Sequence, residues 1–338
     1  MELRDWVILM ERSTEMLKMT EPLECQTITT IAQGEPDDVF ICCGSPEERC
    51  KGVTQKLAPD YHSRIVLLLR YTNHDSEKRE KNIQEMKERL ETVGKIREII
   101  IDEEKPIPVV REIIREIEKY TENHQKPKIS IDISTMIKWH LLILLRALDF
   151  VKKNGILRFL YTEPQDYITD LFQPLSFGIH SIFPIPTYSG NFDFSKNSLL
   201  VLILGYEGDR ALALYEEMDP TECLLLVGKP AYHKEWEGRT EKMNKEIINT
   251  VGASKIRYIH SRNPLAVSQQ LRELLSSPTN LQYNQIISPL GTKPQTLGLY
   301  LYLSTNPSNT VLIYGSPARH NELFYSKGIG RSWVLAYL

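Results

Sequence analysis

The sequence predicts an α/β protein with two tandem Rossmann-like units, each a doubly wound parallel sheet, related by internal duplication. Three observations support this prediction. Short apolar runs alternate with helical patterns, the same order of elements occurs twice, and matched motifs follow corresponding strands of the two halves. The length of 338 residues also suits two domains of ordinary size.

The N-terminal segment, residues 1–34, mixes apolar side chains such as Trp6 and Leu9 with charged ones. This pattern indicates a short helix and an irregular stretch after it. We therefore expect a helical lead-in to the first domain.

The first Rossmann-like half is expected over residues 35–187. It opens with the apolar run 39–43, which is typical of a parallel strand buried on both faces. Four more strands are expected at residues 65–69, 96–101, 129–133 and 157–161, with helices at residues 77–92, 109–120 and 139–151. Because right-handed crossovers return each helix to the sheet, this alternation predicts a doubly wound fold.

The second half is expected over residues 198–338, after a stretch rich in turn residues at 184–197. Its strands are expected at residues 200–204, 223–227, 256–259, 285–288 and 311–314, with helices at 241–251, 266–275 and 296–303. The two halves therefore share one order of elements.

Matched motifs strengthen the case for duplication, because element order alone recurs in unrelated doubly wound proteins. The pairs are the G-x-x-x-x-R motifs at 44–49 and 205–210, the helix-start lysines Lys138 and Lys293, the Tyr-x-x-Pro turns at 161–164 and 314–317, and the Ser-x-Gly-Ile segments at 176–179 and 326–329. All of these pairs occur in the same order along the chain.

Composition excludes several classes of partner and ligand. The formal net charge of −3 favours neither nucleic-acid backbones nor anionic membranes, so we expect no direct DNA binding and no membrane binding. No apolar run could span a bilayer and no signal peptide is visible, so we expect a cytoplasmic protein. The five cysteines and eight histidines lack metal-ligand spacing. We expect buried, reduced thiols, no metal and no cofactor.

Ligands of open parallel sheets bind beyond the carboxyl ends of the strands, where strand order reverses. Gly291, Thr292 and Lys293 follow the fourth strand of the second half. A glycine permits a tight turn, helix-start amides attract an anion and the lysine adds a charge, so this segment suits phosphate. The alternative is a helix-start turn with a solvated lysine.

The residues after the first strands form a second candidate group. Arg49 and Arg210 could fork onto phosphate oxygens, or could form surface salt bridges with neighbouring acidic residues. Ser45 and Tyr206 directly follow Gly44 and Gly205 and could offer hydroxyls to a ligand. Neither motif matches a P-loop or a dinucleotide-binding glycine pattern.

Other polar residues are weaker candidates. His140 lies in an apolar helix pattern, which is typical of a core histidine with its own hydrogen bonds. His320 follows the last strand and is expected at the rim of the same site. Asp132 and Glu163 are also expected near this edge, where a carboxylate could bind a sugar hydroxyl or cap a helix.

The segment from Ser288 to Gly298, SPLGTKPQTLG, resembles the G-T-K segment of CRISPR-associated Rossmann-fold (CARF) sensor domains. The fused pair of units is similar to the SAVED arrangement of related antiviral sensors. The resemblance implies a cyclic-oligonucleotide site formed between the two halves, with Lys138 and Lys293 facing phosphates. The first half has Met136 and Ile137 where the family has Gly-Thr, so the resemblance implies an asymmetric or inactive first site.

The leading hypothesis is a sensor of a nucleotide second messenger, part of a prokaryotic defence or regulatory system and paired with a separate effector protein. Two alternatives remain: an enzyme that cleaves or turns over the nucleotide at the same site, as a ring nuclease does, and a scaffold subunit that binds nothing. The expected ligand-binding residues are Gly44, Ser45, Arg49, Ser134, Lys138, Gly205, Tyr206, Arg210, Gly291, Thr292, Lys293 and His320.

Overall fold

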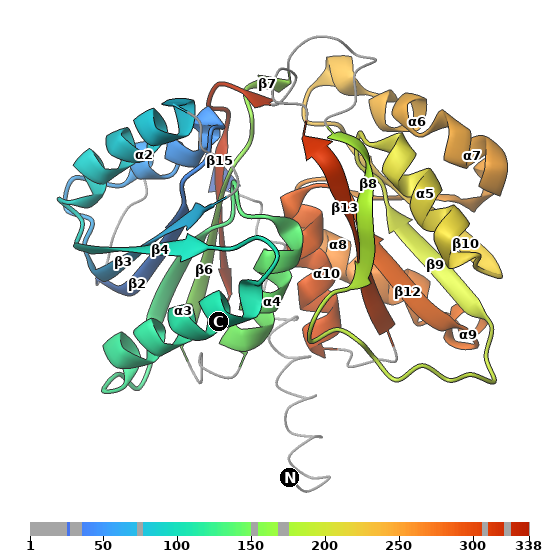
Figure 1. Ribbon diagram of the computed structural model, residues 1–338, viewed down its shortest axis with the longest axis horizontal. Helices are drawn as coiled ribbons and strands as arrows, with labels where there is room; N and C mark the ends of the chain where they lie inside the picture. The colour runs from blue at the N-terminus through green and yellow to red at the C-terminus, as the bar shows by residue number, and fades with distance from the viewer. Residues whose placement is uncertain are drawn as a thin grey trace, which may run out of the picture. The chain divides into compact units, whose positions relative to one another are not determined.

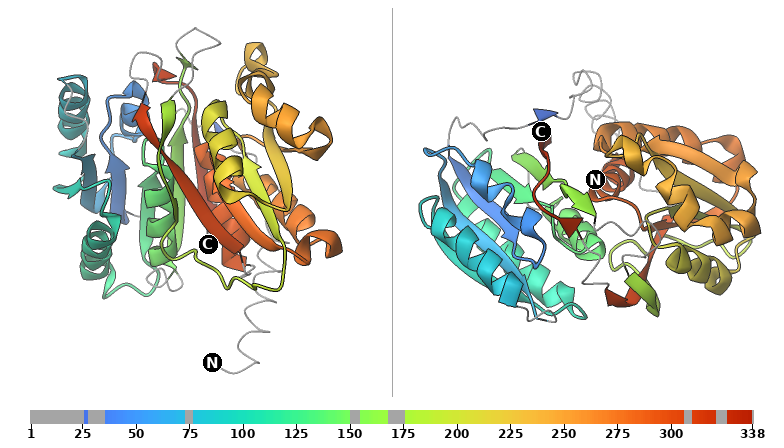
Figure 2. Two further views of the ribbon diagram at one scale, coloured as in Figure 1. Left: turned by 45° about the vertical axis from the view of Figure 1, so that its right-hand side comes forward. Right: turned by 90° about the horizontal axis from the view of Figure 1, so that it is seen from above.

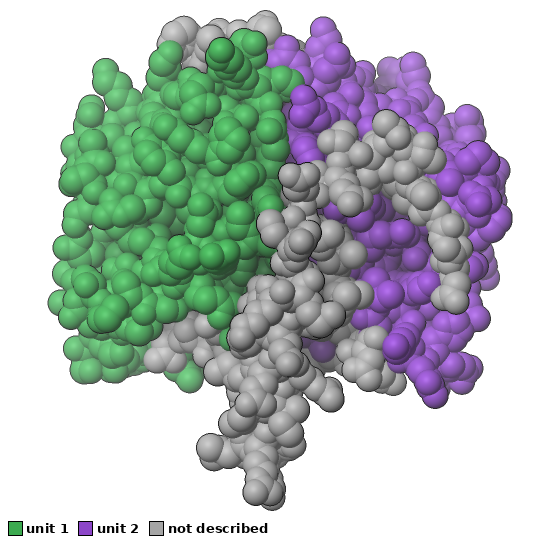
Figure 3. Space-filling view, turned by 180° about the vertical axis from the view of Figure 1, so that it is seen from behind, with its two compact units in different colours: residues 1–24, 176–320 green, residues 25–175, 321–338 purple. Residues whose placement is uncertain are grey.

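The computed structural model describes residues 26–27, 36–72, 77–149, 155–167, 176–305, 310–320 and 326–337. The chain divides into two compact units (Figure 3). Unit 1 comprises residues 1–24 and 176–320, and unit 2 comprises residues 25–175 and 321–338. The helical lead-in expected over residues 1–34 lies outside the described residues, except for the short strand β1 (Gln26–Thr27).

Unit 2 contains a seven-stranded sheet in the order β1-β15-β6-β5-β2-β3-β4 (Figure 1). Its strands besides β1 are β2 (Asp37–Cys43), β3 (Ser63–Tyr71), β4 (Lys95–Ile101), β5 (Lys128–Asp132), β6 (Ile156–Thr162) and β15 (Ser332–Tyr337). Strands β2 to β6 pair in parallel, whereas β15 is antiparallel to β6 and to β1. A small second sheet pairs β7 (Asp166–Tyr167) with β14 (Ser326–Lys327).

Unit 1 contains a six-stranded sheet in the order β11-β10-β9-β12-β13-β8. Its strands are β8 (Ser176–Pro184), β9 (Ser198–Ile203), β10 (Glu222–Lys229), β11 (Ile256–His260), β12 (Asn284–Pro289) and β13 (Thr310–His320). Strands β9 to β13 pair in parallel and β8 is antiparallel to β13. Both sheets therefore follow the order third, second, first, fourth and fifth strand, which confirms the predicted tandem Rossmann-like fold.

Helices cover both faces of each sheet. Those of unit 2 are η1 (Glu48–Lys51), η2 (Thr54–Lys56), α2 (Glu77–Leu90), α3 (Pro106–Thr121) and α4 (Lys138–Leu148). Those of unit 1 are α5 (Gly208–Met218), η3 (Lys234–Trp236), α6 (Arg239–Met243), α7 (Lys245–Val251), η4 (Ala253–Lys255), α8 (Pro264–Leu275), α9 (Pro278–Leu281) and α10 (Lys293–Thr305). The helix expected over residues 241–251 is two helices divided at Asn244, and α5 was not predicted.

The two halves exchange their last strands. Strand β8 follows the fifth strand of the first half but pairs with β13 of unit 1 (Figures 1 and 2). Strand β15 follows the fifth strand of the second half but pairs with β6 of unit 2. The two compact units therefore do not coincide with the halves expected over residues 35–187 and 198–338. Backbone hydrogen bonds place the last strand of each half in the sheet of the other half.

The exchange has the same register in both units. Phe183 of β8 pairs with Tyr314, and Trp333 of β15 pairs with Tyr161. Each aromatic residue follows a glycine with positive φ by the same number of positions, since Gly178 has φ 58° and Gly328 has φ 69°. The Ser-x-Gly-Ile segments thus place a positive-φ glycine at the same distance before each paired aromatic residue, within β8 in one case and between β14 and β15 in the other.

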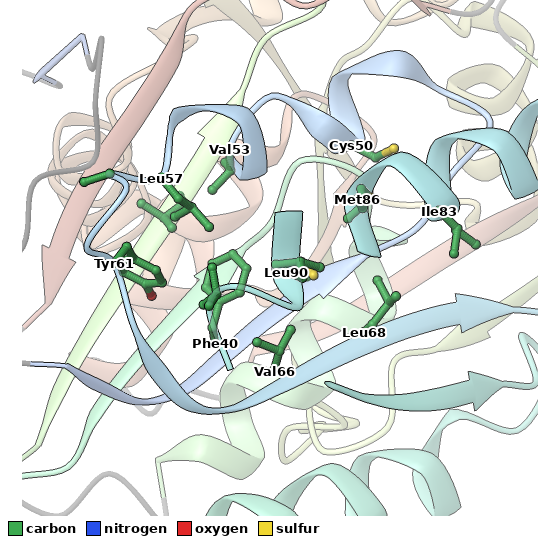
Figure 4. Close-up of a cluster of buried hydrophobic side chains, with 14 residues drawn as sticks. Phe40, Cys50, Val53, Leu57, Tyr61, Val66, Leu68, Ile83, Met86 and Leu90 are labelled. Carbon is green, nitrogen blue, oxygen red and sulfur yellow. The ribbon is translucent and has the colours of Figure 1, made fainter. Parts of the chain in front are cut away.

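Apolar spacing in the sequence accounts for the core of unit 2. Ile83, Met86 and Leu90 recur on one face of the otherwise charged helix α2 and pack against Phe40 and Leu68 of the sheet (Figure 4). Burial of each such side chain contributes about 1.5–3 kcal/mol. In unit 1, α5 and α7 supply Leu214 and Ile247 to an equivalent cluster, which lies against β9, β10 and β12.

Three further sequence expectations can be compared with the described residues. Of the described cysteines, Cys42, Cys43, Cys50 and Cys223 are buried thiols outside any disulfide, as predicted, while Cys25 lies outside the described residues. In the described part of the chain, no helix combines the length and apolar character needed to cross a membrane. No group of three or more metal-ligating side chains occurs there either.

Candidate functional site

The loops after the first and fourth strands of unit 1 lie against each other. Strands β9 and β12 are parallel neighbours, and strand order reverses at β9 because β10 pairs on its other side. A Cβ atom added to Gly205 would lie 2.5 Å from the carbonyl oxygen of Leu290, so this approach requires a glycine. The G-x-x-x-x-R and G-T-K segments of the second half therefore converge at the switch point of the sheet.

The G-T-K segment starts α10 through a capping box. The backbone N–H of Thr292 donates to Oε1 of Gln295 at 2.8 Å, and the N–H of Gln295 donates to Oγ1 of Thr292 at 3.3 Å. Pro294 has no N–H to offer. Because these amides are already satisfied, an anion at this helix start would depend mainly on the charge of Lys293, which is half-buried at the first helical position.

Gly291 is required by the same capping box. A Cβ at this position would lie 2.2 Å from Oε1 of Gln295 and 2.9 Å from Cγ2 of Ile203. The glycine therefore makes room for the Gln295 side chain to fold back onto the loop.

The Gln295 side chain carries an unsatisfied hydrogen-bond donor. The residue is 1% exposed, its Oε1 accepts from Thr292, and its Nε2 has no hydrogen-bond partner. Since the N–H of Thr292 can only donate, Oε1 must face it and the amide orientation is fixed. An unmet buried donor costs about 1–3 kcal/mol, so Nε2 marks a position where a ligand acceptor would be stabilised.

The first-strand loop of unit 1 combines an aromatic ring with a buried cation. Tyr206 is half-buried, and the guanidinium of Arg239 lies 4.6 Å from its ring centre. Burial raises the pKa of Tyr206 to about 12, so its hydroxyl stays protonated at neutral pH. Asn244 Nδ2 donates to the carbonyl oxygen of Gly205 at 2.8 Å and fixes the loop. Arg239, the first residue of α6, and Asn244, which lies between α6 and α7, were not among the predicted site residues and carried no motif in the sequence.

Arg49 and Arg210 form salt bridges with neighbouring acidic residues, as the alternative proposed, but these pairs are buried and not on the surface as expected. Arg210 is 2% exposed and donates to Glu207 and to the carbonyl oxygen of Gly315. Arg49 donates to both carboxylate oxygens of Glu47, at 2.8 and 3.1 Å. Burial opposes the charge of Arg49, but the Glu47 carboxylate raises its pKa above the ordinary value. Both guanidinium groups therefore donate to acceptors of the protein itself.

The predicted residues of unit 2 are largely committed to the fold. Gly44 makes room for Ile83, whose Cγ1 would lie 2.5 Å from an added Cβ. Ser45 Oγ accepts from the N–H of Glu47 at 3.2 Å. Ser134 is fully buried, with its Oγ donating to Asp132 and accepting from the N–H of Thr162. Gly44 and Ser134 are therefore committed to the fold, whereas Ser45 is half-buried and its Oγ accepts one backbone hydrogen bond.

The strand registers offset two of the matched pairs by one position, the glycines Gly44 and Gly205 and the lysines Lys138 and Lys293. Val39, Ile129 and Leu157 lie on one rung of the unit 2 sheet, and Leu199, Gln285 and Thr310 lie on one rung of the unit 1 sheet. These rungs correspond, because Tyr161 and Tyr314 follow them at equal distance. Gly44 is then the counterpart of Leu204, so the aligned glycines Gly44 and Gly205 are one position apart. Gly44 makes room for Ile83, whereas Gly205 makes room for the carbonyl oxygen of Leu290. The two glycines therefore match in the sequence but not in their structural role.

The other polar candidates have protein partners or lie outside the described side chains. His140 is buried, and each of its two ring nitrogens has a hydrogen-bond partner within the protein, as expected for a core histidine. Glu163 Oε1 accepts from Nε1 of Trp333 at 2.8 Å. Lys138 is half-buried at the first position of α4, matching Lys293 on α10. His320 ends β13, where its backbone pairs with Ser176, but its side chain is outside the described part.

No family model and no curated protein matches the chain. Matching solved structures include an N-terminal ketoreductase from a macrolactin assembly line, with TM-score 0.27 and 9% identity over 90% of this chain and 79% of that one. They also include a UDP-GlcNAc 2-epimerase from Neisseria meningitidis bound to UDP-GlcNAc, with TM-score 0.22 and 10% identity over 74% of this chain and 76% of that one. Likenesses this weak carry no inference about ligands, so the fold assignment depends on the strand order itself.

Proposed function

We propose that the chain senses a nucleotide second messenger of the cyclic-oligonucleotide type and passes the signal to a separate effector protein in a prokaryotic defence or regulatory system. The observation that carries the proposal is the convergence of the Gly205 and Gly291 loops at the switch point of unit 1. Such switch points are where doubly wound sheets bind nucleotides.

The chemistry at this convergence favours a nucleotide over a purely apolar or cationic ligand. Lys293 supplies a positive charge beside the start of the 13-residue helix α10. Tyr206 provides an aromatic ring and a protonated hydroxyl on the neighbouring loop. A phosphate with an attached ribose and base would use all three kinds of group.

Calorimetric titration with a panel of cyclic oligonucleotides and mononucleotides tests the proposal. We expect at least one cyclic oligonucleotide to bind and to be recovered intact by chromatography. Lys293→Ala should weaken that binding by about tenfold, the equivalent of about 1.4 kcal/mol, because one charge-assisted phosphate contact is lost.

Lys196→Ala is the matched control, since it removes the same charge from an exposed lysine near the opposite end of strand β9. Its affinity should equal that of the unaltered protein. Absence of binding across the panel, or equal effects of the two substitutions, would count against the sensor.

A further inference from the structure

Corresponding strands occupy one outer edge of each sheet, β4 in unit 2 and β11 in unit 1. Each is the third strand of its half and pairs in parallel with one neighbour, β3 or β10. An edge strand carries backbone N–H and C=O groups that its own sheet does not use, and such groups can pair with another chain. The duplication therefore allows the two edges to be compared directly.

The hydrogen bonds next to β11 show which of its residues face outward. Ser261 follows this strand, and its N–H donates to the carbonyl oxygen of Lys229 on β10. Because the backbone groups of successive strand residues point to opposite sides, those of Ile256, Tyr258 and His260 point away from β10. These three residues form the outer edge of unit 1.

Groups of the protein already bond this edge at both of its ends. Ile256 donates its N–H to the carbonyl oxygen of Ala253, and its own carbonyl oxygen accepts from the Arg257 guanidinium at 2.7 Å. The N–H of His260 donates to Oε1 of Gln270 on α8 at 2.7 Å. An incoming strand would have to displace these bonds, so β11 is a poor template for pairing.

The edge of unit 2 has no such protection among the described residues. The carbonyl oxygen of Ile101 accepts from the N–H of Thr72, which directs the backbone groups of Ile96, Glu98 and Ile100 outward. No described group hydrogen-bonds the backbone of these three residues. Ile100 is also 63% exposed. Strand β4 therefore presents unpaired backbone groups together with apolar surface.

We propose that β4 pairs antiparallel with β4 of a second copy of this chain, which joins two unit 2 sheets edge to edge across a twofold axis. Residues opposite each other in such a pair lie on the same face of the sheet. Placing the axis at Glu98 is the register that uses all three outward-facing residues of both copies. Ile96 of each copy then lies opposite Ile100 of the other, and this apolar pair covers the exposed isoleucine.

The charges along β4 suit a second copy. Glu98 lies 2.6 Å from Nζ of Lys87, and Arg97 pairs with Glu112 at 2.7 Å and with Glu116 at 3.3 Å. The two Glu98 carboxylates would meet at the axis with a Lys87 ammonium beside each, which offsets their repulsion. The charged side chains along the edge also balance, with Lys87, Lys95 and Arg97 against Glu98, Glu112 and Glu116. The edge therefore lacks the excess charge that would select an acidic or basic peptide instead.

The size of the contact sets the expected affinity. Strand β4 has 7 residues, and two such strands bury less than the roughly 1,200 Å² of total surface at which stable interfaces begin. We therefore expect a reversible dimer with a dissociation constant on the order of 10 μM. The interface uses unit 2 alone and involves no residue of the candidate site in unit 1.

Analytical ultracentrifugation of the unaltered protein, at concentrations from about 1 to 200 μM, measures this dimer. Ile100→Lys replaces an apolar contact that occurs twice in the dimer with a charge, so association should weaken by about tenfold or more. Tyr258→Lys is the matched control, since it introduces the same charge at a 52% exposed, outward-facing residue of β11. The control should leave association unchanged.

A cysteine at the axis tests the register. Opposite Cα atoms of a hydrogen-bonded antiparallel pair lie about 5.5 Å apart, which a disulfide can span. Glu98→Cys should therefore give a cross-linked dimer under oxidation, seen in non-reducing electrophoresis. Lys95→Cys, whose two copies would lie about 20 Å apart, should not. Cys25 lies outside the described residues and is replaced by serine in both proteins.

Circular dichroism of each variant checks that these exposed substitutions leave the fold intact. A chain that stays monomeric at about 200 μM would overturn the proposal. So would equal effects of Ile100→Lys and Tyr258→Lys, because the edge of β4 would then have no special role. A dimer in which Glu98→Cys cross-links no faster than Lys95→Cys would exclude the antiparallel pairing about Glu98.

Discussion

The two helix starts that follow the fourth strands differ in what completes their hydrogen bonds. At α4 of unit 2, the hydroxyl of Tyr71 bonds both the N–H of Ile137 and the ring of His140. At α10 of unit 1, the corresponding strand residue is Gly228, and the Gln295 side chain caps the helix with its oxygen alone. The helix start of unit 2 is therefore fully hydrogen-bonded by the side chains of Tyr71 and His140. The helix start of unit 1 retains a buried donor without a hydrogen-bond partner, Nε2 of Gln295.

The background to this difference is the same in both units. Each has the same strand order, an exchanged antiparallel edge strand in the same register, and a buried arginine paired with a nearby glutamate. The contrast at the helix start therefore lies within a shared order of parallel strands.

The largest effect is expected from breaking the shared ion pairs. Glu207→Ala and Glu47→Ala each leave a buried guanidinium, that of Arg210 or Arg49, without its carboxylate. Each change should lower the free energy of unfolding of its unit by about 3–5 kcal/mol, measured by urea denaturation. Glu222→Ala, which breaks an exposed pair with Lys255, should cost under about 1 kcal/mol. Equal, small effects of all three changes would show that the twinned pairs do not matter to stability.

Tyr71→Phe tests the closed helix start directly. The substitution keeps the ring but leaves the N–H of Ile137 and Nδ1 of His140 without the hydroxyl. We expect unit 2 to lose about 1–3 kcal/mol of unfolding free energy, measured by urea denaturation. Tyr258→Phe, at a 52% exposed tyrosine of unit 1, should have no measurable effect. If the two substitutions behave alike, the hydroxyl of Tyr71 does not complete the site.

The closed site should also make unit 2 sensitive to acid. Burial lowers the pKa of His140 to about 4 from an ordinary value of 6.5, so between these values the unfolded chain binds a proton that the folded one does not. The resulting stability is complete above pH 6.5 and declines as pH falls, by about 2 kcal/mol at pH 5.

Urea denaturation of the unaltered protein and of His140→Gln at pH 7 and pH 5 measures this effect. The glutamine variant lacks the titrating group, so its stability should fall less across the same interval. Parallel losses in the two proteins would mean that His140 is not kept neutral by its surroundings.

The smallest effect tests the equivalence of the exchanged strands. Gly178→Ala and Gly328→Ala each place a Cβ on a backbone with positive φ, which costs about 1–2 kcal/mol. The added Cβ at Gly178 meets only Ala318 at 3.6 Å, whereas at Gly328 it meets the side chain of Gln165. We expect similar losses of thermal stability, slightly larger at Gly328. A loss at one glycine alone would show that the two positive-φ glycines of the exchanged segments are not equivalent.

Sequence patterns predicted the parallel core well because each strand is marked by local apolar runs. The five strands of each half and most crossover helices follow from runs such as residues 39–43 and from helical spacing such as Ile83, Met86 and Leu90. The candidate site was predicted less well. Its loops after β9 and β12 were identified, but Gly228 and Asn244 come from other segments with no motif of their own. The T-x-x-Q spacing of Thr292 and Gln295 was a capping signal that sequence reasoning missed.

By itself the sequence determined the fold class, the twofold repetition and the positions of the loops at the carboxyl edges, because these depend on local periodicity and turn residues. Only the tertiary structure decided which sheet receives strands β8 and β15, since an edge strand is chosen by backbone hydrogen bonds that any sequence can form. It also decided that Arg49 and Arg210 serve buried glutamates. Finally, it decided that Tyr71 closes one helix start where Gly228 leaves the other with an unmet donor, because that contrast joins residues far apart in the chain.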